Sequence, residues 1–209
     1  MRLYLVRHGE TDWNKARKIQ GQVDIPLNEF GRHLARETHK GVKDVRFDIC
    51  FSSPLSRAKE TASLILEGRD VKIIDDNRIM EMNFGDYDGG CCSKEGWNLP
   101  EDFAKFFDDP ANYKRPPHGE DFYDLQKRVG EFLEELIHDE KYKESHILIS
   151  THGAALAAML NYIRKNPMEK FWGIGVHKNC AITEILVEDE TPKILSENVV
   201  YYKDEVAAW

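Results

Sequence analysis

The chain has 209 residues, of which 41% are hydrophobic and 32% are charged, a balance typical of a globular domain with a substantial core. Its formal net charge of −8 and its pI near 5.5 argue against nucleic acid or an anionic membrane as a partner. The sequence shows no secretory signal, no apolar run long enough to span a bilayer and no Cys-x-x-Cys pair, so we expect a reduced, cytoplasmic protein.

The chain opens with an apolar segment, residues 2–6, that predicts a buried strand ending in Arg7, His8 and Gly9. Ligands of open α/β sheets bind at the carboxyl ends of the strands. Gly9 lets the backbone approach a ligand closely, and Asn14 can supply an amide donor. Together with Arg7 these residues favour an anion site, although a lone Arg-His-Gly triplet more often marks a histidine with a structural role.

Residues 11–24 are expected to form a polar loop, after which Asn28 is a suitable N-cap for an amphipathic helix. A strand over residues 47–51 leads into Ser53 and Pro54, which we expect to be the N-cap and the first residue of the next helix. Arg57 would then lie about one turn inside that helix, with its guanidinium over the end of the strand. The alternative for Arg57 is a surface arginine that forms ion pairs along the helix.

Glu81 follows a short strand predicted over residues 71–74. Its neighbours Met80, Met82 and Phe84 are apolar, and desolvation by such neighbours raises the pKa of a carboxyl group. A raised pKa would suit Glu81 for proton transfer, whereas an exposed loop glutamate is the alternative.

The region from residue 86 to about residue 120 shows little periodicity, and we expect a small helical insertion there. Its aromatic residues would form either a lid or substrate wall or a small satellite core: Trp97, Phe103, Phe106 and Phe107. Its basic residues would either contact a second anionic group or lie in solvent: Lys105, Lys114, Arg115 and His118.

The rest of the chain predicts a helix over residues 121–138, a strand over 146–150, a helix over 154–162, and a hairpin of strands 180–187 and 193–201 connected by 189–192. The strand 146–150 leads into Thr151, His152 and Gly153, so a second strand ends in His-Gly.

If these two strands are parallel, His8 and His152 lie at one edge of the sheet, where Arg7 and Arg57 also arrive. Two arginines can hold the oxygens of a phosphoryl group through forked hydrogen bonds. The sequence shows neither an acidic cluster suited to magnesium nor a tetrahedral zinc set. We therefore expect a phosphate site without a metal ion.

Four segments resemble, in order, the motifs of the histidine phosphatase superfamily, the phosphoglycerate mutase-like proteins. They are residues 5–11 (LVRHGET), residues 52–62 (SSPLSRAKETA), Glu81 with Phe84 and Gly85, and residues 151–153 (THG). Two departures are mild. In the last motif, Thr151 and Ala154 replace a serine and a glycine that are common in the family. Asp121 stands where relatives often have a serine, although aspartate also caps helices well.

The resemblance implies a three-layer α/β/α sandwich with a mostly parallel central sheet. It implies a single domain over residues 1–209, with a helical lid or insertion at about 86–120. It also implies a metal-independent phosphomonoesterase, without a cofactor, that hydrolyses a small phosphorylated metabolite through a phosphohistidine.

Roles for individual residues follow from the same resemblance. His8 would be the nucleophile, and Glu81 would protonate the leaving alcohol and then activate water. Arg7, Arg57 and His152 would stabilise charge on the phosphoryl oxygens. The remaining residues expected to contact phosphate or border the substrate are Asn14, Gln20, Gly21 and Gly153.

Two other functions stay open. Residues 81–89 resemble the phosphatase branch, and the chain lacks the extra length of typical cofactor-dependent mutases, which favours a phosphatase over a phosphoglycerate mutase. A binding module that has lost turnover is less favoured, since the nucleophile, the acid and the second histidine are all present. The substrate could be a sugar phosphate, a phosphoglycerate, a nucleotide or a phosphorylated ribazole. The sequence does not decide the oligomeric state, and a homodimer stays open.

Overall fold

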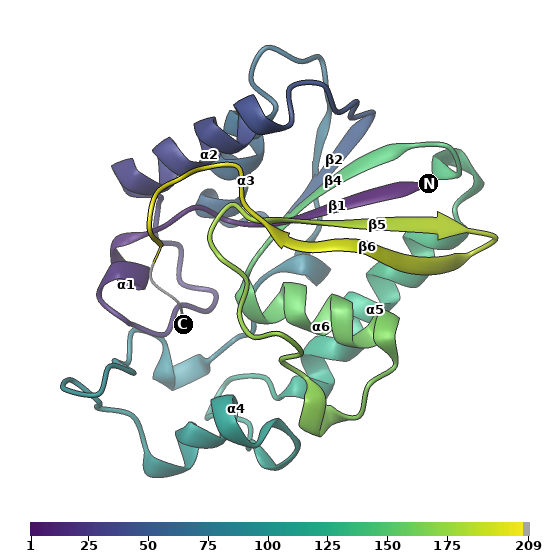
Figure 1. The fold of residues 1–209 in the computed structure, drawn as a ribbon. Helices are drawn as coiled ribbons and strands as arrows, with labels where there is room; N and C mark the ends of the chain where they lie inside the picture. Colours follow the sequence, from purple (N-terminus) through teal and green to yellow (C-terminus); the bar gives the residue numbers. More distant parts are fainter. Residues whose placement is uncertain (207–209) are drawn as a thin grey trace.

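A six-stranded sheet lies between two layers of helices in the computed structural model, which describes residues 1–206 (Figure 1). The strands are β1 (Arg2–Arg7), β2 (Ile49–Ser52), β3 (Ile73–Asp75), β4 (His146–Thr151), β5 (Ile182–Glu188) and β6 (Thr191–Val199). The helices are α1 (Asp12–Lys15), α2 (Glu29–Gly41), α3 (Ser56–Ile65), α4 (Lys105–Asp108), α5 (Phe122–His138) and α6 (Gly153–Arg164). Residues 207–209 of the expected domain lie outside the described part of the chain.

The strand order is β3-β2-β4-β1-β5-β6. The first four strands are parallel, β5 is antiparallel to β1, and β6 is antiparallel to β5. The expected α/β fold with a mostly parallel central sheet is therefore confirmed. Within residues 1–206 no helix is both long and apolar enough to cross a membrane.

Successive side chains of β1 point to opposite faces of the sheet, as strand geometry requires. Leu3 and Leu5 join the core beneath α5 and α6, whereas Tyr4 and Val6 join the core beneath α3. Because both faces are covered, the strand is aliphatic or aromatic at each position from Leu3 to Val6, as is typical of a buried parallel strand. The apolar run that predicted β1 thus has a direct physical cause.

The pairing of β1 with β4 brings the two predicted His-Gly ends together. Arg7 lies opposite Thr151 in the parallel ladder, and the backbone N–H of His8 donates to the Thr151 carbonyl at 2.9 Å. The expectation that His8 and His152 share one edge of the sheet is therefore correct.

The predicted N-cap at Ser53 is wrong, because α3 begins at Ser56 and its N-cap is Leu55, which makes no side-chain capping bond. The Ser53 hydroxyl instead contacts the His152 ring at 2.8 Å and accepts a hydrogen bond from the Leu55 backbone N–H at 3.3 Å. This long-range contact replaces the local cap. Arg57 consequently lies at the second residue of α3 and not a full turn inside it.

Other local predictions hold with small shifts. Asn28 caps α2, and Asp121 caps α5 in a reciprocal box with Asp124. The loop predicted over residues 11–24 contains the short helix α1, which that prediction missed. The closing hairpin turns at Asp189 and Glu190 alone, both with positive φ, so the connection is shorter than expected.

The region from residue 86 to residue 120 contains α4 and several 3₁₀ turns. Phe103 and Phe106 are only 2% and 4% exposed and belong to the same core as α5 and α6, so they do not form a separate satellite core. Trp97 is 38% exposed.

Two glycines let the end of β1 approach α2. A Cβ at Gly31 would lie 2.6 Å from the Glu10 backbone nitrogen, and one at Gly9 would lie 2.6 Å from the Gly31 carbonyl oxygen. We expect Gly31→Ala to lower the free energy of unfolding by about 2 kcal/mol through overpacking, despite the higher helix propensity of alanine. Urea denaturation measures this difference.

Gly130→Ala in α5 is the matched control, because its Cβ would meet the Tyr162 ring, a side chain that can turn away. The free energy of unfolding should fall less in Gly130→Ala than in Gly31→Ala. A Gly31→Ala protein as stable as the parent would contradict the close approach.

Candidate active site

A cavity opens at the carboxyl edge of β1 and β4. Six residues selected from the sequence line it: Arg7, His8, Asn14, Gln20, Glu81 and Gly153. Its apolar lining consists of Ile19, Phe84, Phe106, Phe107, Ala154, Trp172 and Val176. Gly21, Arg57 and His152 are not among the lining residues.

His8 is 3% exposed, and its Nδ1 lies 2.7 Å from the carbonyl oxygen of Gly9. A carbonyl oxygen only accepts, so Nδ1 carries the proton and donates it in this hydrogen bond. Burial, assisted by Arg57 and Arg7, holds the pKa of His8 well below its ordinary value. The ring is therefore neutral, and the lone pair of a potential nucleophile is on Nε2.

Arg7 is 4% exposed, and its Nη1 donates to the carbonyl oxygen of His177 at 2.6 Å. Burial lowers the pKa of Arg7 to about 10, an effect that the negative charge of Glu81 partly offsets. The guanidinium therefore remains charged at neutral pH and supplies a positive charge to the cavity.

The loop before β5 supports this strand end, and sequence reasoning missed its contribution. The Asn179 side-chain amide donates to the His8 carbonyl at 2.9 Å. His177, whose backbone carbonyl accepts from Arg7, has a ring that contacts Glu197 at 3.1 Å and Thr183 at 3.3 Å. No sequence motif or periodic pattern marks these loop positions, so nothing in the residues pointed to them.

Arg57 and His152 are both fully buried and contact each other. The Arg57 Nε–H donates to His152 Nδ1 at 3.2 Å, so the proton of the neutral His152 ring is on Nε2, which donates to Ser53 at 2.8 Å. The His8 and His152 rings have centroids 5.1 Å apart. Burial and the charge of Arg57 hold the pKa of His152 well below its ordinary value.

Arg57 is fully buried, and carbonyl oxygens satisfy its charge. Its Nη1 donates to Val23 at 3.0 Å and its Nη2 to Gly21 at 2.6 Å. Gly21 therefore holds Arg57 in place through its backbone. Burial lowers the pKa of Arg57 to about 10, with Glu81 opposing the change.

Asn14 and Gln20 reach the cavity from the segment around α1. The Asn14 side-chain oxygen accepts from the Thr11 backbone N–H at 3.1 Å, which leaves its amide nitrogen as a donor. The side-chain amide of Gln20 can be oriented to suit both Thr11 and Arg57. Its nitrogen then donates to Thr11 Oγ1 at 2.6 Å, and its oxygen accepts from Arg57 Nε at 3.2 Å.

Glu81 is 7% exposed, and its carboxyl group lies at the N-terminus of α6. Its Oε1 accepts from the backbone N–H groups of Met82 at 2.9 Å and Ala155 at 3.0 Å, and its Oε2 accepts from Ala154 at 3.1 Å. Burial raises the pKa of Glu81, although the three amides and Arg57 favour the charged form. The predicted direction of the pKa shift is therefore correct.

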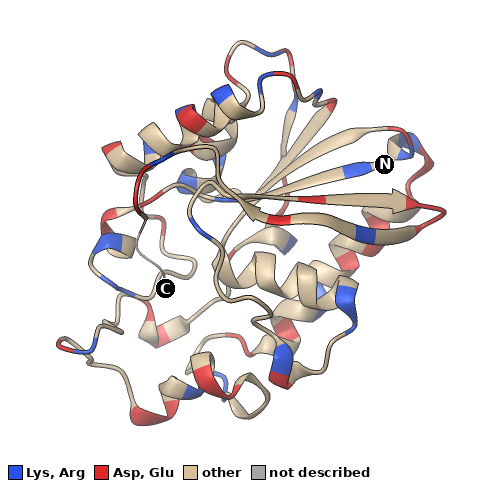
Figure 2. Ribbon diagram, in the orientation of Figure 1, with Lys and Arg blue, Asp and Glu red and all other residues tan. Residues whose placement is uncertain are grey.

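The charge of the cavity does not come from a basic surface. Figure 2 shows lysine and arginine residues interspersed with acidic residues over the outer helices and turns. Arg115, which could have bound a second anionic group, is paired with Asp121 and Asp124. Within residues 1–206 no group of three or more His, Cys, Asp or Glu side chains could hold a metal ion.

Comparisons with known proteins match this chain to one family. Residues 3–200 match the model of the histidine phosphatase superfamily (branch 1). The chain is 40% identical over 159 residues to the phosphatase PhoE of Bacillus subtilis, covering 76% of this chain and 75% of that one. It is 32% identical to the adenosylcobalamin/alpha-ribazole phosphatase of Salmonella typhimurium, covering 96% of this chain and 98% of that one.

Among solved structures, YhfR of Bacillus stearothermophilus superimposes with a TM-score of 0.88 at 32% identity, over 96% of this chain and 98% of that one. Other similar proteins are named phosphoserine phosphatases and phosphoglycerate mutases.

The two neutral histidines make stability depend on pH. Their pKa values are lower in the folded protein than in the unfolded chain, so the unfolded chain binds protons preferentially. The free energy of unfolding should therefore fall as pH decreases below about 6.5, by at most about 1.4 kcal/mol per pH unit for each histidine. Denaturation with urea between about pH 7 and pH 5 measures this slope.

In a His8→Asn/His152→Asn double variant the slope should be smaller. His177, whose pKa burial also lowers, would maintain part of it. An unchanged slope would show that these two rings are not the groups that resist protonation.

Proposed function

Because the chain belongs to branch 1 of the histidine phosphatase superfamily, we propose that it hydrolyses a small phosphorylated metabolite, without a metal ion, through a phosphohistidine on His8. The observation that carries this proposal is the hydrogen bond from His8 Nδ1 to the Gly9 carbonyl, which puts the lone pair on Nε2. His8 lines the same cavity as Arg7 and Glu81. A nucleophile, a cation for the phosphoryl oxygens and a proton donor are thus within one cavity.

In the first step, His8 Nε2 forms a bond to phosphorus as the bond to the ester oxygen breaks. The electron pair of that bond goes to the alcohol oxygen, which takes the proton of Glu81. The raised pKa of Glu81 favours the protonated form that this step needs. The three amides that face its carboxyl group stabilise the carboxylate after the proton has left.

In the second step, the Glu81 carboxylate takes a proton from water, and the water oxygen attacks phosphorus. The bond between phosphorus and His8 breaks, its electrons return to Nε2, and inorganic phosphate leaves. Glu81 is then protonated again, so the cycle closes without any further reactant.

The phosphoryl oxygens require cationic and neutral donors. Arg7 and Asn14 line the cavity and would contact these oxygens directly, with Gly153 providing close approach at the start of α6. Arg57 would supply positive charge, and His152 would supply a hydrogen-bond donor. Neither lines the cavity, so each would contact the phosphoryl group by giving up one of its present hydrogen bonds within the protein. Gln20 borders the substrate, and Gly21 acts through Arg57.

The apolar wall of the cavity favours an ester with an apolar or ring-bearing alcohol. Phe106, Phe107 and Trp172 belong to the apolar lining, and Arg7 is the one lysine or arginine among the lining residues, so a second phosphate or a carboxylate would find no cation of its own there. A phosphoglycerate mutase has to hold a substrate with such a second anionic group. This composition of the wall supports hydrolysis over mutase activity, and the insertion at 86–120 would act as a wall of the site.

The proposal is tested by phosphate release from a panel of phosphomonoesters in EDTA. The parent protein should release phosphate and form an acid-labile phosphohistidine. His8→Ala should lose both by more than about a hundredfold, because the covalent route is removed. A phosphoenzyme that still forms in His8→Ala would show that the nucleophile is another residue.

Phe107→Ala tests the substrate class. It should raise KM for an aryl phosphate such as naphthyl phosphate by about tenfold, because apolar contact area is lost. Its inhibition constant for inorganic phosphate should not change, since Phe107 would contact only the alcohol. Equal changes in both constants would contradict this division of the cavity.

A further inference from the structure

Glu81 lies on a stretch of irregular backbone. After the 3₁₀ turn Asn77–Ile79, the chain runs to Phe84 without joining a strand or a helix. Backbone carbonyls in such a segment have no partners in a sheet or helix, yet buried polar groups need partners. Something outside the segment must therefore fix its path and, with it, the direction of the Glu81 side chain.

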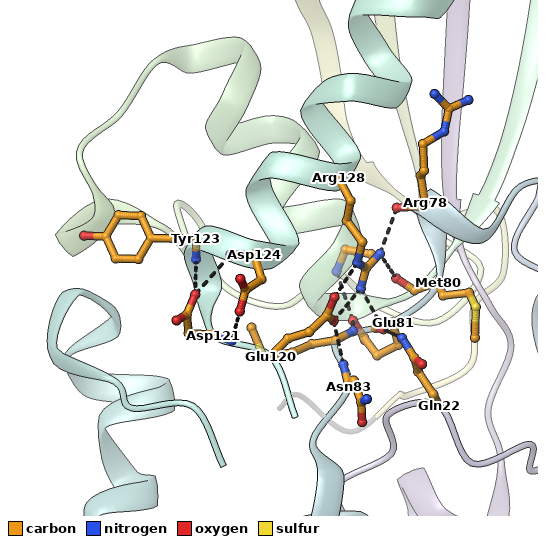
Figure 3. A network of polar contacts seen from close by, with 12 residues as sticks. Gln22, Arg78, Met80, Glu81, Asn83, Glu120, Asp121, Tyr123, Asp124 and Arg128 are labelled. Carbon is orange, nitrogen blue, oxygen red and sulfur yellow. Dashed lines mark hydrogen bonds and ion pairs between the residues drawn. The ribbon is translucent and has the colours of Figure 1, made fainter. Parts of the chain in front are cut away.

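Arg128, in the second turn of α5, meets this need. Figure 3 shows its guanidinium facing the segment. Its Nη1 donates to the carbonyl oxygens of Arg78 at 2.8 Å and Met80 at 2.7 Å, and its Nη2 donates to that of Glu81 at 2.9 Å. One side chain thus holds three carbonyls within four residues of chain.

Glu120 orients this guanidinium. Its Oε1 accepts from Arg128 Nε at 2.8 Å, and its Oε2 accepts from Nη2 at 2.9 Å (Figure 3). With the three carbonyls, these bonds occupy all five N–H groups of the arginine. Glu120 also accepts from the Asn83 backbone N–H at 2.9 Å, so it fixes the chain on the other side of Glu81.

We propose that Arg128, oriented by Glu120, is a positioning residue that places Glu81 for proton transfer. This inference rests on the proposed role of Glu81 as the proton donor. Arg128 contacts the Glu81 backbone and is not among the residues that line the cavity, so its effect on proton transfer would come through the position of Glu81. Lysine cannot replace it, because a single ammonium group cannot bond three carbonyls and both oxygens of a carboxylate.

A purely structural role for Arg128 would predict a different result. Loss of folded protein lowers the turnover of every substrate equally. Misplacement of the acid instead slows the first step, transfer of the phosphoryl group to His8, only for esters whose alcohol needs a proton to leave. An alkyl phosphate needs that proton, whereas p-nitrophenyl phosphate releases a stable anion without it.

The test compares kcat/KM, which reports the first step alone, for an alkyl phosphate and for p-nitrophenyl phosphate in four variants of the full chain. Arg128→Lys should lower the ratio of kcat/KM for the alkyl ester to kcat/KM for the aryl ester by about tenfold, in the same direction as Glu81→Gln. Glu120→Gln should lower it less, because it retains one acceptor, and it provides a second measurement if Arg128→Lys folds poorly. Arg115→Lys is the matched control, since Arg115 pairs with Asp121 and Asp124 at the start of the same helix.

Each outcome decides between the two roles. A ratio that falls in Arg128→Lys or Glu120→Gln and stays constant in Arg115→Lys supports the inference. A ratio lowered by Glu81→Gln alone overturns it and leaves the proposed function intact. A ratio that Glu81→Gln itself does not change overturns the role of Glu81 as donor, and the inference with it.

Discussion

The burial of two guanidinium groups is the constraint on which the site depends. Arg7 is 4% exposed and Arg57 is fully buried, and a charge removed from water is costly unless hydrogen bonds and opposite charges replace the lost hydration. The chain supplies these partners from distant segments: the carbonyls of Gly21, Val23 and His177. The loop before β5 and the segment after α1 are therefore tied to the strand ends by the need to satisfy these charges.

The same two charges determine the protonation of their neighbours. Two cations nearby, together with burial, keep His8 neutral, which is the form that can attack phosphorus. Glu81 is subject to opposing influences: burial favours its protonated form, whereas the amides at the start of α6 and the charge of Arg57 favour the carboxylate. A group that must both release and accept a proton benefits from such opposing influences, because the site contains features that stabilise each form.

The sequence predicts those parts of the site that depend on regular structure. Apolar runs ending in His-Gly located two strand ends, and parallel pairing brought His8 and His152 together. Predictions failed where a long-range contact replaced a local preference, as at Ser53, which bonds His152 and does not cap α3. Asn179 and Arg128 act through irregular segments, where no periodicity connects a residue to its partner.

The wall of the cavity has a further consequence. The ring centroid of Phe106 lies 5.1 Å from that of Phe84, 5.2 Å from that of Phe122 and 5.0 Å from that of Trp172. The surface that would face a substrate is therefore continuous with the core beneath α5 and α6. Substitutions at Phe106 that would admit a new alcohol also remove packing that stabilises the fold. Evolution of new substrate preferences in this chain should therefore begin at the less buried Phe107, where a change has the smaller stability cost.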